Sequence, residues 1–219
     1  IYVGGFEGDG TCNTTIPYFL DLREIGQPPP GNNPTPVTIK GNTITDGDGA
    51  GINIDTAGAC VDSNIITGTD QGIHISGPGY SNAQSNYNII SNNVVTDSPH
   101  TGIDVVGSGN TFDSNTSNGA QYSSGFDFDF RSQNNVITNN VANNNAQYGF
   151  YFDINLENDG WLDSDGPGSV GHTFTGNTAS GNGVADIEGI SGPPELTITS
   201  FTSGEASEWY VQNCPSCPL

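Results

Sequence analysis

Short stretches of alternating apolar and polar residues recur along the chain, and most of them begin at a glycine. An alternation with a period of two places the apolar side chains on one face of a β-strand and the polar ones on the other. We therefore predict a short strand at each recurrence. These stretches are GINID (51–55), GIHIS (72–76), GIDVV (102–106), GFDFD (125–129), GFYFD (149–153) and, without the glycine, VADIE (184–188).

A second kind of phrase, rich in Asn, Thr and other β-branched residues, lies between these strands. Helix is disfavoured there, because Asn, Gly and β-branched residues are poor in helix interiors. A unit of 21 to 35 residues with two or three short strands is typical of a solenoid, whose units stack to bury their apolar faces. The phrases are GNTITDGDG (41–49), SNIITGTDQ (63–71), YNIISNNVVTDS (87–98), GNTFDSNTS (109–117), NNVITNNVANNN (134–145) and HTFTGNTASGN (172–182).

The repeated phrases resemble those of right-handed parallel β-helix proteins of the pectate-lyase-like and NosD-like superfamily. The resemblance covers residues 36–190 and implies an all-β fold, a single-stranded right-handed parallel β-helix of about six coils. Residues 1–35 are expected to form an N-terminal cap with a Pro-rich connection, and residues 191–219 a C-terminal cap or assembly tail. Such repeats occur in lyases, hydrolases, epimerases, adhesins and surface-layer proteins, so the fold alone indicates no activity.

Stacking of the coils is expected to gather carboxylates on one outward face. If each glycine opens the same strand of successive coils, residues of equal offset lie about 4.8 Å apart along the sheet. Like charges at that spacing repel, so at least one carboxyl pKa should rise unless a cation compensates. The residues of this acidic face are Asp104, Asp127, Asp129 and Asp153, with His74 one coil away and Arg131 just beyond the strand.

The same register makes predictions for the other columns. In the last unit it sets Ala185 beside Phe150, Ile187 beside Phe152 and Glu188 beside Asp153. Asparagines at the turns are expected to form hydrogen-bonded ladders along the axis. These asparagines are Asn64, Asn93, Asn115 and Asn140.

Three interpretations of the acidic face stay open. It is a glycosidase site, with one carboxyl as acid and another as base or nucleophile; it binds Ca²⁺ through hard oxygen ligands; or it is a solvated surface that keeps the protein soluble. A Gly-His-Gly motif like that of polygalacturonase-type hydrolases is absent, and Arg131 is the one well-placed base for lyase chemistry. His100 and His172 lie in predicted turns without evident triad partners.

Calcium is also expected in loops built of acids and glycines. None of them matches an EF-hand, and Asp-Gly pairs are also ordinary turn formers. The best candidate is the inserted loop 158–168 with Asp159, Asp163 and Asp165, and the second is the stretch 46–51 with Asp46 and Asp48.

The net charge of the chain limits the partners that we expect it to bind. The chain carries 24 acidic residues against three Lys and Arg, a net charge of -21. Nucleic acid is therefore not expected to bind, because no basic surface can replace phosphate counterions. An acidic polysaccharide would be repelled unless cations intervene. The chain contains no apolar run long enough for a membrane span.

Cysteines and sequons indicate an extracellular setting. The chain starts at Ile1 and contains no Met, so we expect a secreted product whose leader has been removed. Four cysteines fit an oxidising compartment and allow three pairings, one of which links the N-terminal segment to an early coil. The predicted disulfide residues are Cys12, Cys60, Cys214 and Cys217, and the glycosylation candidates are Asn13 and Asn115.

Two functions follow from these observations. The first is an extracellular structural protein, a self-assembling cell-surface, sheath or filament subunit stabilised by Ca²⁺ and disulfides, whose partner is another copy of itself. The alternative is a carbohydrate-active enzyme, a glycoside hydrolase or related protein that uses the clustered aspartates on a neutral or cation-masked polysaccharide. An enzyme needs a groove over the aspartates flanked by aromatic platforms such as Tyr151 or Trp161, whereas a subunit needs complementary ends.

Overall fold

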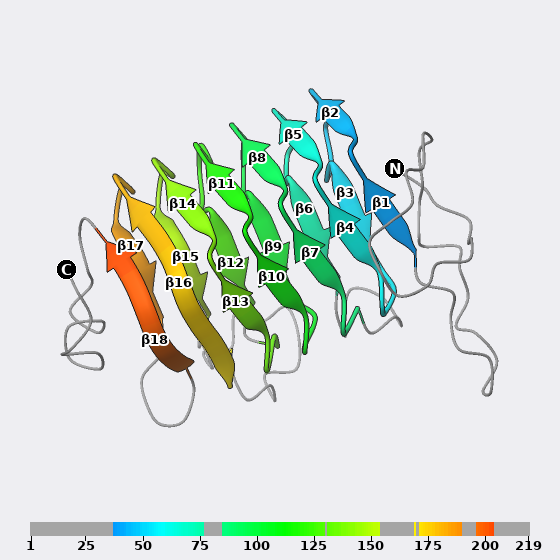
Figure 1. The fold of residues 1–219 in the computed structure, drawn as a ribbon. Coiled ribbons are helices and arrows are strands. Elements are labelled where there is room, and N and C mark those ends of the chain that lie inside the picture. The colour runs from blue at the N-terminus through cyan, green and yellow to red at the C-terminus, as the bar shows by residue number, and fades with distance from the viewer. Residues whose placement is uncertain are drawn as a thin grey trace, which may run out of the picture.

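The computed structural model in Figure 1 is a stack of parallel β-coils. It describes residues 37–76, 85–129, 131–153, 169 and 171–189, together with the backbone of β18 (Leu196–Ser203). Every strand pair of the described residues is parallel, as a solenoid requires. The all-β parallel β-helix expected from the sequence is confirmed, whereas the two predicted caps lie outside the described residues.

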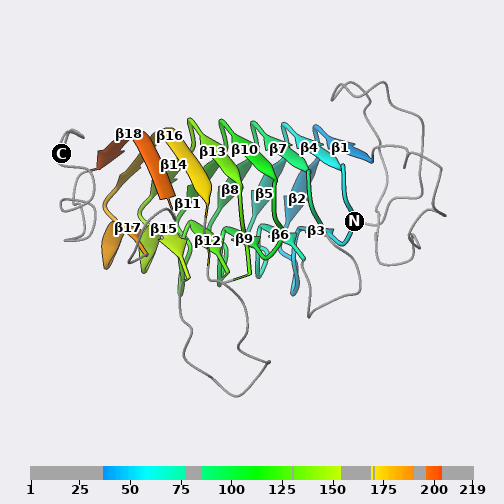
Figure 2. The same cartoon turned by 90° about the horizontal axis from the view of Figure 1, so that it is seen from below.

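The coils build two sheets. The 6-stranded sheet runs in the order β17-β15-β12-β9-β6-β3, and the 12-stranded sheet in the order β1-β4-β7-β10-β13-β16-β14-β11-β8-β5-β2, with β18 paired to β16. Figure 2 shows the smaller sheet as a layer along one side of the stack. Its strands are β3 (Ile52–Ile54), β6 (Ile73–Ile75), β9 (Ile103–Val105), β12 (Phe126–Phe128), β15 (Tyr148–Phe152) and β17 (Ala185–Glu188).

The 12-stranded sheet has two rows of short strands. The long strand β16 (His172–Ser180) pairs with β13 at its start and with β14 at its end, so it joins the rows. The first row holds β1 (Thr38–Lys40), β4 (Cys60–Asp62), β7 (Ile89–Ser91), β10 (Thr111–Asp113) and β13 (Val136–Thr138). The second row holds β2 (Thr43–Thr45), β5 (Ile65–Thr67), β8 (Val94–Thr96), β11 (Thr116–Asn118) and β14 (Val141–Asn143).

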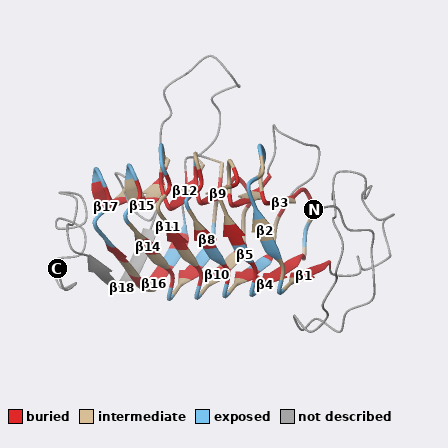
Figure 3. Cartoon of the chain, turned by 90° about the horizontal axis from the view of Figure 1, so that it is seen from above, coloured by how far each residue is buried: buried red, intermediate tan, exposed pale blue. Residues whose placement is uncertain are grey.

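The core is a set of apolar columns that run along the stack. Because side chains alternate along each strand, the two apolar positions of β12 point inward and its Asp127 points outward. Phe126 stacks on Phe150 and Phe128 on Phe152, each pair with ring centroids 4.8 Å apart. All four rings are fully buried. Figure 3 shows buried positions along the strands of successive coils.

The predicted register holds from β3 to β15 and is wrong for β17. Ile187 pairs with Phe150, Glu188 with Tyr151, and Ala185 with Tyr148, which is a shift of two residues from the expected register. Gly189 follows with a φ of 119°, and a Cβ there would meet the carbonyl oxygen and Cβ of Phe152. Only glycine therefore fits at position 189, directly after β17. Glu188 lies beside Tyr151 and not beside Asp153.

Residues with positive φ lie at the corners of the coils and form columns along the stack. One column alternates strictly between Asx and Gly, and each Asx side chain covers the glycine of the next coil. A Cβ at Gly68, for example, would lie 2.9 Å from Oδ1 of Asp46, so only glycine fits there. The column consists of Asp46, Gly68, Asp97, Gly119, Asn144 and Gly181, all with φ between 53° and 73°.

A buried asparagine ladder follows another corner, and it confirms the predicted ladder. In Asn140, Nδ2 donates to the carbonyl of Phe112 and to Oδ1 of Asn177, at 3.0 and 2.9 Å. Its own Oδ1 accepts the backbone N–H and the Nδ2 of Asn115. The rungs from the second onward are fully buried. The six rungs of the ladder, from the first to the last, are Asn42, Asn64, Asn93, Asn115, Asn140 and Asn177.

The ladder overturns the prediction of a glycosylation site at Asn115. Its side chain is fully buried, and Nδ2, the atom that a glycan would take, donates to the carbonyl of Ile90 and to Oδ1 of Asn140. A glycan on that nitrogen would break the ladder. The other sequon, Asn13, lies outside the described residues.

A second ladder ends in a histidine. The backbone N–H of Asn88 donates to Oδ1 of Asn110, and that of Asn110 to Oδ1 of Asn135. The N–H of Asn135 then donates to Nδ1 of His172, at 3.1 Å. Since Nδ1 accepts, the ring proton is on Nε2, which lies 2.9 Å from the hydroxyl of Ser169. Burial lowers the pKa of His172 to about 3, so the imidazole is neutral.

This histidine predicts a loss of stability in acid. The pKa of His172 is about 3 in the folded protein and 6.5 in the unfolded chain. The contribution of this residue to folding stability is therefore complete above pH 6.5 and declines as pH falls towards 3. The expected loss is on the order of 1 kcal/mol per pH unit. In His172→Asn the new Oδ1 continues the ladder without a titratable group. Thermal unfolding from neutral to acidic pH should show a shallower decline for the variant than for the parent, and equal slopes would refute this assignment.

Candidate functional site

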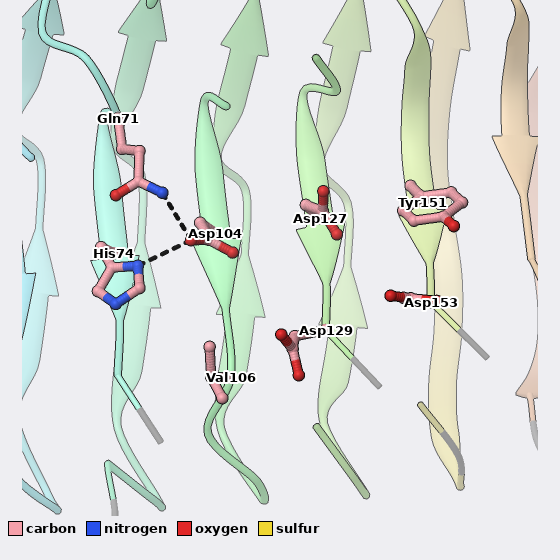
Figure 4. Close-up of a pocket in the computed structure, with 8 residues that line it drawn as sticks. All are labelled: Gln71, His74, Asp104, Val106, Asp127, Asp129, Tyr151 and Asp153. Carbon is pink, nitrogen blue, oxygen red and sulfur yellow. Dashed lines mark hydrogen bonds and ion pairs between the residues drawn. The ribbon is translucent and has the colours of Figure 1, made fainter. Parts of the chain in front are cut away.

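A pocket lies on the outer face of the 6-stranded sheet, over the middle coils. Its volume is about 430 Å³. Strands β6, β9, β12 and β15 and the residues next to them form its lining, because residues at equal offsets in successive coils stand side by side (Figure 4). The lining residues are Gln71, His74, Asp104, Val106, Asp127, Asp129, Tyr151 and Asp153.

Asp104 is held by two donors from the preceding coil. Nε2 of Gln71 donates to Oδ2 of Asp104 at 2.7 Å, and Nδ1 of His74 lies 2.8 Å from the same oxygen. A carboxylate can only accept, so Nδ1 of His74 carries the ring proton in this pair. Figure 4 shows the second oxygen of Asp104 on the side of β12. The carboxylate is therefore oriented towards Asp127.

Asp129 is held by a cation from its own loop. Nε and Nη2 of Arg131 donate to its two oxygens at 2.9 and 3.0 Å, and the backbone N–H of Arg131 donates to Oδ1 at 3.0 Å. This bidentate geometry is the strongest form of an Arg–carboxylate pair. The Arg131 contact fixes Asp129 at the rim of the pocket.

Asp127 has the opposite environment. It stands between Asp104 on β9 and Tyr151 on β15, and no hydrogen bond to its carboxyl is found among the described residues. Burial raises the pKa of Asp127 well above its usual value, and the charges of Asp104, Asp153 and Asp129 raise it further. The pocket thus contains one carboxyl with a raised pKa beside two carboxylates that are held by hydrogen-bond donors.

Tyr151 forms the side of the pocket towards β17, and Tyr148 packs on its ring. Tyr148 and Tyr151 stack with their ring centroids 5.0 Å apart. Burial raises the pKa of Tyr151 to about 12, with Asp153 and Asp127 adding to the shift, so the phenol remains protonated. The expected aromatic flank is thus present at Tyr151, and Trp161 lies outside the described residues. Aromatic rings of this kind pack on the C–H faces of sugars.

The fold and the stacked repeats agree with a comparison against protein families. The model of the right-handed beta helix region matches residues 31–190. The chain belongs to this family. A comparison of this chain with curated proteins found no match.

Solved structures that resemble this β-helix protein include the periplasmic alginate epimerase AlgG. The TM-score is 0.53 at 20% identity, over 75% of this chain and 39% of that one. A single-site mutant of AlgG aligns with a TM-score of 0.51 at 19% identity, over 75% of this chain and 40% of that one. The chain thus corresponds to less than half of these enzymes, and at this identity the similarity concerns the fold.

The structure gathers the carboxylates that the sequence placed on one face. Asp104, Asp127, Asp129, Asp153 and His74 all line the pocket, whereas Arg131 reaches it through Asp129. Sequence reasoning missed Gln71 and Val106. Gln71 stands directly before Gly72 and outside β6, where the period-two alternation of the strand gives no side-chain direction. No pattern distinguished it from other turn residues.

The predicted calcium ligands are not assembled in the described part of the β-helix. No group of three or more His, Cys, Asp or Glu side chains that could hold a metal occurs among the described residues. Asp46 instead covers Gly68 at a left-handed corner, and Asp48 is exposed in the loop that follows. The stronger candidates, Asp159, Asp163 and Asp165, lie outside the described residues, so calcium there stays a prediction.

Other predicted features have mixed outcomes. Cys60 is disulfide-bonded, and its partner lies outside the described residues, as do Cys12, Cys214 and Cys217. His100 has a partner that the sequence did not reveal, since its Nδ1 lies 2.6 Å from Oδ1 of Asp70. Within the described residues, no helix is long and apolar enough to cross a membrane.

Proposed function

We propose that this β-helix protein is a polysaccharide-processing enzyme that acts at the acidic pocket. The observation that carries the proposal is the contrast between Asp127, whose pKa is raised by burial and by neighbouring carboxylates, and Asp104, whose carboxylate is oriented by two donors. Two carboxyl groups with different proton affinity, on adjacent strands, are the requirement for acid-assisted cleavage of a glycosidic bond.

In the proposed reaction, Asp127 is the proton donor. Its proton passes to the glycosidic oxygen as the bond from that oxygen to the anomeric carbon breaks. Asp104 stabilises the positive charge at the anomeric carbon, either directly or by taking a proton from the attacking water. Water adds across the broken bond, so one hydroxyl group appears on each product. Gln71 and His74 orient Asp104 for this step.

Two further observations support a carbohydrate. The Tyr148–Tyr151 stack flanks the pocket on the β15 side, where a sugar ring could pack. The solved structures of similar fold are of an enzyme named for the polysaccharide alginate. That enzyme is named as periplasmic, which supports export of this chain as part of the proposal.

The test is turnover of defined polysaccharides by the full chain. Neutral polysaccharides, and acidic ones with and without Ca²⁺, are incubated with the protein, and new reducing ends are counted. We expect products from at least one of them, with activity that falls as pH rises through the pKa of Asp127. A matched charge control is Asp48→Asn, which removes an exposed carboxylate outside the pocket and should keep full activity. No products from any polysaccharide would overturn the proposal.

The role of a self-assembling structural subunit, which the sequence also predicts, requires a separate experiment. Head-to-tail assembly depends on the ends of the stack and on the C-terminal tail, and both lie mostly outside the described residues. Electron microscopy with and without Ca²⁺ and reductant should show regular filaments or sheets if the chain is a subunit. Monodisperse single molecules in every condition would overturn that role.

A further inference from the structure

Asp104 and Asp127 occupy equivalent positions on adjacent parallel strands. They are register partners in β9 and β12, and both line the pocket side by side (Figure 4). Adjacent strands lie about 4.8 Å apart, so the two carboxyl groups project outward at about that spacing. In glycosidases a separation of about 5–5.5 Å makes one carboxylate a nucleophile, whereas a water molecule between the two groups needs about 6.5–9.5 Å. The register therefore bears on the course of the reaction.

The contacts of Asp104 leave one of its oxygens available for attack. Gln71 and His74 both contact Oδ2, at 2.7 and 2.8 Å. Among the described residues no donor contacts Oδ1, and Figure 4 shows this oxygen on the side of β12. The side chain is 19% exposed, so a substrate can reach it. The two donors thus fix the carboxylate without occupying the oxygen that faces the pocket.

The other carboxylates of the pocket lie further from Asp127. Asp129 is two residues along the same strand, and both of its oxygens accept hydrogen bonds from the guanidinium of Arg131. Asp153 stands beside Asp129 on the next strand, about 8 Å from Asp127 by the same spacings. That separation suits a base that activates water. Two courses therefore compete, direct attack by Asp104 and attack by a water between Asp127 and Asp153.

We propose that Asp104 is a covalent nucleophile and that hydrolysis at this pocket retains the configuration of the anomeric carbon. This inference rests on the proposed function and specifies its chemical course. It is carried by the register of β9 and β12, which sets the two carboxyl groups too close for an intervening water, and by the two donors on Oδ2 of Asp104.

The first step forms an ester. A lone pair on Oδ1 of Asp104 attacks the anomeric carbon as the bond from that carbon to the glycosidic oxygen breaks. The electron pair of the broken bond stays on the oxygen, which takes the proton of Asp127. The products are an alcohol and a sugar ester of Asp104. Oδ2 becomes the carbonyl oxygen of this ester and can still accept from Gln71 and His74.

The second step removes the ester with water. The carboxylate of Asp127 takes a proton from the water, whose oxygen attacks the anomeric carbon. The bond to Asp104 breaks, and its electron pair returns to the carboxylate. Each step inverts the anomeric carbon, so the two together retain its configuration. The sum is addition of one water across the glycosidic bond, and both carboxyl groups return to their starting forms.

The change of role at Asp127 agrees with its surroundings. Burial raises the pKa of this carboxyl, and the charges of Asp104, Asp153 and Asp129 raise it further. The ester of Asp104 is neutral, so one of these charges disappears after the first step. The pKa of Asp127 then falls at the stage where the residue has to remain ionised and act as a base.

The first experiment determines the configuration of the product. The full chain is incubated with soluble β-glucan, xylan, mannan and galactan, and proton NMR spectra are recorded as the first reducing ends form. We expect the new reducing ends to have the configuration of the cleaved bond before mutarotation mixes the two forms. Initial products of opposite configuration would overturn this inference, leave the proposed hydrolysis in place and indicate a water-activating base such as Asp153. If none of the polysaccharides is cleaved, the proposed function fails, and this inference fails with it.

A matched pair of variants then identifies the nucleophile. Asp104→Ala is expected to lose at least about 100-fold in turnover. Sodium azide should restore at least about tenfold of that loss, because the small anion fills the space of the carboxylate and attacks in its place to give a glycosyl azide of inverted configuration. In Asp129→Ala, which removes the same group from the other outward column, azide should restore nothing.

Thermal unfolding shows whether both variants fold. In folded variants, rescue of Asp129→Ala, or no glycosyl azide from Asp104→Ala, would overturn the assignment of Asp104. The product configuration is measured on the parent chain, so it tests retention even if a variant does not fold.

Discussion

The Asp127→Asn variant is expected to lose at least about 100-fold in turnover and yet to be more stable than the parent protein at neutral pH. The loss follows because the amide has the shape of the carboxyl but no proton to give to the glycosidic oxygen. The gain follows because burial, with the charges of Asp104, Asp153 and Asp129, disfavours the ionised form of Asp127 in the folded protein, whereas an amide is neutral at every pH. Activity and stability thus move in opposite directions at one residue.

The pH dependence of this gain has a definite sign. The folded pKa of Asp127 is raised above its value of 3.8 in the unfolded chain, so stability is fully present below pH 3.8 and is lost as pH rises through the folded pKa. The advantage of the variant should therefore be absent in strong acid and grow towards neutral pH. A gain on the order of 1 kcal/mol corresponds to about 2–4 °C in Tm for a domain of this size.

Calorimetry across pH and a turnover assay at one pH measure both effects. Asp48→Asn is the control for the loss of one negative charge, and it should alter neither quantity appreciably. A stabilised variant with full turnover would remove Asp127 from the reaction. A destabilised variant would show that its carboxyl makes favourable contacts, contrary to the environment described.

The Asn140→Ala variant is expected to cause the largest loss of stability among the ladder positions. The substitution leaves the buried N–H of Asn115 and the carbonyl of Phe112 without their partners. It also removes the contact with Asn177 in the next coil. Each buried polar group left unsatisfied costs about 1–3 kcal/mol, so the sum is several kcal/mol. Urea unfolding measures it, and a lower midpoint with an unchanged slope is the expected result.

Asn42 offers a matched control at the end of the same ladder. Its Nδ2 donates to the carbonyl of Lys40 and to Oδ1 of Asn64, and the residue is only partly buried. Asn42→Ala should therefore cost much less than Asn140→Ala, because water can reach the groups it exposes. Similar losses at both positions would mean that the ladder contributes through asparagine's turn conformation and not through its buried hydrogen bonds.

The acidic face shows how much of the site the sequence could predict. Period-two alternation after a glycine is a local property, so it placed Asp104, Asp127 and Asp153 outward and, through stacking, on one face. It could not show that Gln71 and His74 both contact Oδ2 of Asp104, because those contacts depend on side-chain rotamers between coils.

The last coil and the histidine ladder show a different limit. The 35-residue unit before 184–188 contains an insertion, and its length alone does not determine where pairing resumes. The strand resumed two residues away from the expected register, with Ile187 beside Phe150. His172 looked like a turn residue, although it is the end of a ladder whose other rungs are asparagines. Both errors come from reading a repeat where the repeat is imperfect.

The sequence by itself determined the parallel β-helix, its inward apolar columns and one asparagine ladder, because a stacked repeat places equivalent residues next to one another. Only the tertiary structure decided which carboxyl differs from the rest. Asp104, Asp127 and Asp129 have the same residue type and similar local sequence, but proton affinity depends on burial and on charges contributed by neighbouring coils. Burial and three surrounding carboxylates act on Asp127, whereas Asp104 and Asp129 receive donors from Gln71, His74 and Arg131.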